Sequence, residues 1–127
     1  MKKLLAFLAF SLLASQAFAG NTVSMVADLT STSAVTGATL YGDTATTATT
    51  SSVLIGKTST GVALAGNTAS NGYALATQHK SGNRAFGTAY DSTSVYYKDV
   101  TAVGTAVKQT ISTTDSTEFT GAGWTSM

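Results

Sequence analysis

Residues 73–100, YALATQHKSGNRAFGTAYDSTSVYYKDV, decide the fold of this chain. Residues 73–79 alternate between a face with Tyr, Leu, Thr and His and a face with two Ala and Gln, which is the period of a β-strand. Residues 80–83 (KSGN) predict a hairpin loop, and 84–90 (RAFGTAY) return as a strand with larger side chains on one face. Residues 95–100 (VYYKDV) add a third strand. In each of the first two strands of this meander, small side chains occupy one face and large side chains the other, which indicates that another part of the protein packs closely on one side of the sheet.

Outside the meander, β-branched and small residues dominate and Gly or Asn recurs at short intervals. The pattern predicts further antiparallel strands and no long helix after the leader. The expected segments are a strand over 21–29, a weaker strand over 31–40, a hairpin or kinked strand over 52–64, a turn-rich connector over 66–72, and a short final strand over 118–124. Residues 43–52 (DTATTATTSS) favour an exposed loop, with an O-glycosylated segment as the alternative.

We therefore expect an all-β fold, a small antiparallel sheet or meander in a single domain. Tyr73, Leu75, Phe86 and Trp124 are the core candidates, since large apolar side chains gain most from burial. Tyr96 and Tyr97 are adjacent in a strand, so one ring should lie on each face of the sheet. At least one of these tyrosines should then face solvent or a partner.

The first residues have the form of a secretory leader. Lys2 and Lys3 precede an apolar run over 4–13, and 17–19 (AFA) is a small-x-small cleavage site. The run is about half of the ~20 residues that a spanning helix needs, which disfavours a retained anchor. We expect a cleaved signal peptide over 1–19 and one globular domain over 20–127.

Composition restricts the partners and cofactors of the exported domain. Removing Lys2 and Lys3 leaves five basic and six acidic residues, so a basic surface for nucleic acid is not expected. The chain has no cysteine, which excludes disulfides, thiolate zinc sites and iron–sulfur clusters. Only 10% of the residues are charged, which favours association with another protein.

Two motifs that carry chemistry elsewhere are weak here. Gly56-Lys57-Thr58 resembles the end of a phosphate-binding loop, but Ser51 stands where that pattern needs Gly. His79 is the only histidine and no Gly-x-Ser-x-Gly elbow accompanies it. One His and six scattered carboxylates form no metal-ligand cluster. We expect no enzyme activity, no cofactor and no small-molecule substrate.

The meander and the C-terminus carry a resemblance. GYALATQHKSGNRAFGTAYDSTSVYYKD (72–99) and TEFTGAGWTSM (117–127) resemble the C-terminal β-sheet of long type IV pilins. A pilin begins with a long apolar helix, whereas an export leader stands in that place here. The chain therefore resembles the separate C-terminal chain of two-chain type IV pilins, also described as a short-pilin chaperone.

The resemblance implies a structural subunit of a type IV pilus-like filament. In that family a short helical pilin chain supplies the filament core, and the β-rich chain binds it and forms the outer surface. It implies export, assembly in the periplasm and a place in a cell-surface or extracellular filament, with membrane contact only through the partner. The expected partner contacts are the apolar residues of the first predicted strand, Val23, Met25, Val26 and Leu29; alternatively, these residues complete the chain's own sheet.

Two other classes of function stay open at this point. A self-assembling fibre or adhesin subunit without a helical partner fits the low charge and the Thr-rich strands. An exported hydrolase would rest on His79 and the abundant serines alone.

Overall fold

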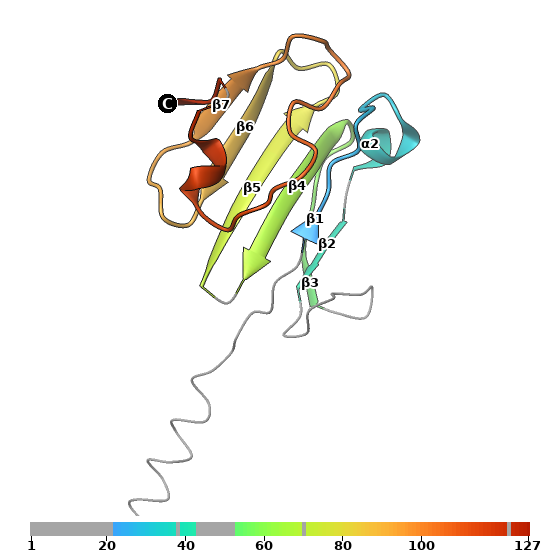
Figure 1. The fold of residues 1–127 in the computed structure, drawn as a ribbon. Coiled ribbons are helices and arrows are strands. Elements are labelled where there is room, and N and C mark those ends of the chain that lie inside the picture. The colour runs from blue at the N-terminus through green and yellow to red at the C-terminus, as the bar shows by residue number, and fades with distance from the viewer. Residues whose placement is uncertain (1–21, 38, 43–52, 70, 122) are drawn as a thin grey trace, which may run out of the picture.

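The computed structural model describes residues 22–37, 39–42, 53–69, 71–121 and 123–127. Six strands form one antiparallel sheet in the order β1-β4-β5-β6-β7-β8, and β2 pairs with β3 separately (Figure 1). The elements are β1 (Thr22–Val23), α2 (Thr32–Thr36), β2 (Thr39–Gly42), β3 (Val53–Lys57), β4 (Val62–Ala69), β5 (Gly72–His79), β6 (Arg84–Ala89), β7 (Tyr96–Asp99), the 3-10 helix η1 (Ser116–Phe119) and β8 (Thr125–Ser126). The all-β prediction is confirmed, and α2, the longest described helix, has five residues.

The predicted meander is present as β5, β6 and β7. β5 pairs with β6 from Ala74↔Ala89 to Gln78↔Ala85, and the loop between them covers residues 80–83 as expected. The connector expected over 66–72 is wrong. β4 continues to Ala69 and β5 begins at Gly72, so only two residues join the strands and the Asn-Gly signal marks the end of a tight hairpin.

Three other strand predictions are also wrong, because tertiary contacts override local preference. Residues 32–36 form α2 rather than part of a strand, and the turn after it needs a positive φ of 78° at Gly37. Residues 116–119 are η1, and the last strand begins only at Thr125. β3 pairs with β2, and β4 lies in the six-stranded sheet, so 52–64 is neither a hairpin nor one kinked strand.

One face of the six-stranded sheet carries the core, and we name it the closed face. Its side chains are Ala63, Ala65, Ala74, Ala76, Gln78, Ala85, Gly87, Ala89 and Tyr96. In Figure 1 the segment after β7 and η1 cross this face. Leu29, Ile111 and Phe119 from outside the meander are almost fully buried and form one cluster with the strand alanines. The small side chains of the strands leave the space that these larger ones fill.

Gly87 shows how close this packing is. A Cβ built at Gly87 would lie 2.4 Å from Cε1 of Phe119, so only glycine admits the ring. Phe119 also stacks on Tyr96 with ring centroids 5.3 Å apart, and Trp124 meets it edge-on at 5.0 Å. The expected burial of Trp124 is thus confirmed in part, since it packs against the core while remaining partly exposed.

The segment after β7 is tied to the closed face by hydrogen bonds. Gln78 is 1% exposed; its side-chain NH₂ donates to the carbonyl of Thr105 at 2.8 Å, and its Oε1 accepts from the N–H of Val107 at 3.0 Å. Residues 25–29 run beside the same segment, where the N–H of Leu29 donates to the carbonyl of Gly104 at 2.8 Å. This pairing carries Leu29 into the core.

Glu118 of η1 stabilises the part of this segment that includes residues 108–113. Its side chain is 4% exposed and forms an ion pair with Lys108. Its Oε2 accepts from the N–H groups of Ser112 and Thr113 at 2.9 and 2.7 Å. Burial alone would raise the pKa of Glu118, but Lys108 and these N–H donors together hold it below the ordinary value.

We expect Glu118→Gln to lower the free energy of unfolding at pH 7 by about 1.5–3 kcal/mol, the scale of hydrogen bonds to a charged group. Because the folded-state pKa is depressed, the stabilisation is present above the unfolded-state pKa of about 4.3 and is lost as pH falls through the folded-state value. The difference from the wild type should therefore shrink below about pH 4. Urea titrations at pH 7 and pH 3.5 measure it, and a gap of equal size at both would contradict the prediction.

The leader and residues 43–52 lie outside the described residues. Within the described part, none of the helices has the length and apolar character required to span a bilayer.

Candidate partner-binding face

The opposite face of the sheet has a different composition, and we name it the open face. Paired residues on neighbouring strands direct their side chains to the same side. The register therefore assigns to the open face Val23, Leu64, Gly66, Thr68, Tyr73, Leu75, Thr77, Phe86, Thr88, Tyr97 and Thr125. All six strands contribute to this surface. The register also places Val62, His79, Arg84 and Asp99 on it, so the charged pair Arg84 and Asp99 lies at the β5–β6 hairpin end of a face that is otherwise uncharged.

Large side chains on the open face are only partly covered. Tyr73 is 41% exposed and Phe86 is 40% exposed, while Leu64 at the β4 end is buried. The Leu75 side chain extends across the neighbouring strand β4, where a Cβ built at Gly66 would lie 2.6 Å from the Leu75 Cδ2. Val95 and Met127, joined by a 2.8 Å backbone hydrogen bond, add exposed apolar surface at the β7–β8 edge. The exposed apolar area therefore lies mainly over β5 to β8.

Two of the core predictions are thus wrong. Tyr73 and Phe86 were expected in the core because of their size, but they project from the face that the chain itself leaves open. Leu75 is half-buried on the same face. The alternation was predicted correctly; the covering side chains from η1 and from residues 25–29 decide which face becomes the core.

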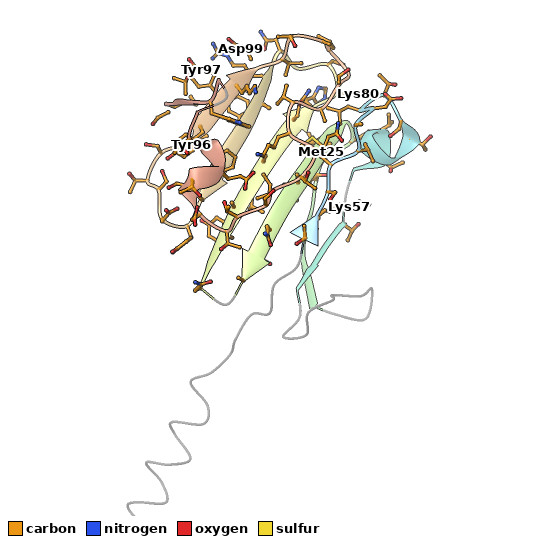
Figure 2. All side chains as sticks on the ribbon, viewed as in Figure 1. Met25, Lys57, Lys80, Tyr96, Tyr97 and Asp99 are labelled. Atoms are coloured by element: carbon orange, nitrogen blue, oxygen red, sulfur yellow. The ribbon has the colours of Figure 1, made fainter. Side chains whose placement is uncertain are left out.

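Charged groups stand at one end of the open face. The Nε of Arg84 donates to Oδ1 of Asp99 at 3.2 Å, and the guanidinium lies over the Tyr97 ring at 4.5 Å from its centroid. Tyr97 and Asp99 project from β7 near the top of the sheet (Figure 2). Tyr96 takes the closed face against Phe119, so the expected division of the two tyrosines between the faces is confirmed.

The four residues predicted to contact a partner are separated by the fold. Val23 pairs with Gly66 and is half-buried on the open face. Met25 and Leu29 are buried in the chain's own core cluster, at 5% and 0% exposure. Both follow the end of β1 at Val23, so they complete the core of this chain rather than its sheet. Val26 is 38% exposed. Of the four, only Val23 is brought together with the open face, because the chain leaves the sheet after β1.

His79 occupies the turn after β5 and shows a local structural contact. Its Nδ1 accepts from the N–H of Ser81 at 3.1 Å, which stabilises the hairpin loop. Lys57 of the phosphate-loop-like motif is exposed at the end of β3. Throughout the described segments, His, Asp and Glu side chains form no group of three that could hold a metal ion.

Sequence reasoning placed Phe86 and Thr88 on one face but missed Tyr97, which pairs with Phe86 across β6 and β7. The signal was present in part, because alternation places Phe86 and Thr88 together. The cross-strand register that adds Tyr97 needs the hairpin lengths, which the structure supplies. Comparisons with protein-family models, curated proteins and solved structures returned no match for this chain.

Proposed function

We propose that this chain is a non-enzymatic structural subunit of a type IV pilus-like filament, whose open face binds a short helical pilin chain. The observation that carries the proposal is the half-exposed state of Tyr73 and Phe86 on a sheet face whose charged side chains, Arg84 and Asp99, lie at one end. An antiparallel sheet face in permanent contact with water is usually polar. A face with Leu, Phe, Tyr and Val favours coverage by another layer.

An amphipathic or fully apolar helix suits this surface. Domains are stable when each apolar sheet face packs against a second layer. Among the described residues, the segment after β7 and η1 form such a layer on the closed face, whereas Tyr73 and Phe86 on the open face stay exposed. The open face mixes ring side chains with Thr68, Thr77 and Thr88, so a helix with small and aliphatic side chains could pack between the rings. In this proposal the exported chain stabilises the helical pilin chain and forms the outer filament surface.

The first test is recovery of the partner from the native host with a tagged chain. We expect the wild type to co-isolate a short chain rich in apolar, helix-forming residues. Phe86→Asp places a charge in the centre of the open face and should lower the recovered partner by about tenfold or more, as expected for a central interface residue. Val103→Asp is the matched control, since Val103 is 64% exposed on the segment after β7 and outside the open face.

Photo-crosslinking defines the contact independently. A photoreactive residue at Tyr73 should crosslink the same short chain, whereas one at Val103 should not. Recovery of the wild type without any such chain would overturn the proposal. Ordered fibres formed by the purified chain alone would instead favour a self-assembling subunit, for which the two-residue edge strands β1 and β8 offer little backbone to pair.

A further inference from the structure

Arg84, at the charged end of the open face, restricts which chemical groups the partner must present there. Arg84 is 47% exposed and uses only Nε in its bond to Asp99. A guanidinium has five N–H donors, of which four belong to the two terminal amino groups. Those two groups have no acceptor among the residues that the structure describes. Arg84 therefore keeps most of its hydrogen-bonding capacity at the boundary of an apolar surface.

The position of the guanidinium is already restricted. The Tyr97 ring supports it from one side at 4.5 Å, and Asp99 fixes Nε at 3.2 Å. A cation held over a ring loses less freedom on binding than a free side chain does. Because Phe86 pairs with Tyr97 in the register, the guanidinium lies beside the exposed apolar side chains of the open face.

Coverage of the open face would remove water from this group. A cation that loses water without gaining acceptors is costly, whereas a bidentate carboxylate satisfies two donors in the planar geometry of guanidinium. Asp99 occupies Nε only, and no other acid of the meander lies at this end, since Asp91 bonds Ser116 beyond the far end of β6. The required acceptor must then come from the partner.

We infer that Arg84 receives a carboxylate of the bound helix and so fixes which part of that helix lies at the β5–β6 hairpin. The inference rests on the proposed function and adds the chemistry that the partner presents at this end. An acidic side chain and the terminal carboxylate of the helix share this chemistry. Lys80, which follows β5 at the same hairpin, adds positive charge that favours either of them.

The test compares Arg84→Gln, Arg84→Lys and the control Lys57→Gln in co-isolation from the native host. Lys57 is exposed on the separate β2–β3 sheet, below and to the right of Asp99 in Figure 2. Arg84→Gln should lower partner recovery by about tenfold or more, because a desolvated charge pair is broken. Arg84→Lys keeps the positive charge but lacks the planar pair of N–H donors that binds a carboxylate in a bidentate way, so it should give an intermediate loss of partner recovery. Lys57→Gln should behave as the wild type.

Salt dependence provides a readout that a purely structural role would not change. Wild-type recovery should fall as NaCl is raised, and Arg84→Gln should lose most of this dependence. Substituting the acidic residues of the recovered helix by Gln, and separately amidating its C-terminus in a synthetic helix, identifies which carboxylate Arg84 holds. If neither change weakens binding, the inference fails.

The outcomes also separate this inference from the proposed function. If Arg84→Gln recovers the partner as the wild type does while Phe86→Asp does not, the carboxylate contact is wrong and the open face still binds. If Phe86→Asp also recovers the partner fully, the proposed function itself fails. Thermal unfolding midpoints of Arg84→Gln and Phe86→Asp that equal the wild-type value show that both variants are folded, so a change in recovery reflects binding.

Discussion

Phe119→Ala is expected to lower the free energy of unfolding by about 3–5 kcal/mol, the range for truncating a buried aromatic residue. Phe119 is the largest of the fully buried side chains, at 1% exposure. A domain of this size has a total stability of about 5–15 kcal/mol, so the variant should lose a large fraction of its stability and unfold at a much lower urea concentration than the wild type. Urea titration followed by far-UV circular dichroism measures the change.

The reason is that Phe119 joins three parts of the molecule. Its ring lies against Gly87 of β6, stacks on Tyr96 of β7 and meets Trp124 before β8. η1 positions it, because the carboxylate of Asp91 accepts from both the N–H and the hydroxyl of Ser116 at 2.8 Å. Removing the ring leaves a cavity beside a glycine, which no side chain of β6 can fill.

Phe86→Ala is the matched comparison, since it removes a phenylalanine ring from the open face of β6, whereas Phe119 of η1 packs on the closed face of that strand at Gly87. Phe86 is 40% exposed, so the loss should be about 1 kcal/mol. The fluorescence of Trp124, the only tryptophan, gives a second probe of unfolding. Equal losses for the two phenylalanine variants would contradict the assignment of core and open face.

The fold of the meander follows from local pattern, whereas the choice of its buried face does not. Residues 73–79 and 84–90 alternate, and β5 and β6 appear where the pattern predicts them. The large side chains of Tyr73 and Phe86 lead to the prediction that their face is the core. The buried face is the one with alanine and glycine, since Phe119, Ile111 and Leu29 arrive from outside the meander and need the space. A short sequence window contains no information on those distant partners.

The same limit applies to the candidate site. Val23 pairs with Gly66 as a strand residue, but the chain leaves the sheet after it and takes Met25 into the core. Strands of two residues, such as β1 and β8, have too little length to show a period of two. The residues that lie side by side on the open face depend on the registers of six strands, so they can be identified only when the lengths of the hairpins are known.

Gln78 provides the second large expected effect, because its amide is the one buried polar side chain among the described residues of the closed face. Its two contacts differ in kind: the Thr105 carbonyl can only accept and the Val107 N–H can only donate. An ionised carboxylate at this position would keep the bond from Val107 and face the Thr105 carbonyl without a proton. We therefore expect Gln78→Glu to lose about 3–5 kcal/mol of stability at neutral pH, as for an unpaired buried charge.

This loss should depend on pH with a defined sign. Burial beside a carbonyl raises the pKa of the introduced carboxyl in the folded state above its unfolded value of about 4.3. The folded state then binds the proton more tightly, so stability falls as pH rises from the unfolded to the folded pKa, by at most about 1.4 kcal/mol per pH unit. Below about pH 4 the protonated side chain can donate to Thr105, and the variant should approach the wild type.

Gln78→Leu distinguishes this charge effect from loss of the amide contacts. Leucine leaves the Val107 N–H and the Thr105 carbonyl without their partner at every pH, so its deficit should be about 1–3 kcal/mol and nearly constant between pH 4 and pH 7. Urea midpoints of the wild type and both variants, measured across that range, separate the curves. Parallel curves for Gln78→Glu and Gln78→Leu would show that residue 78 is in contact with water in the folded protein, and that the segment after β7 does not cover the sheet there.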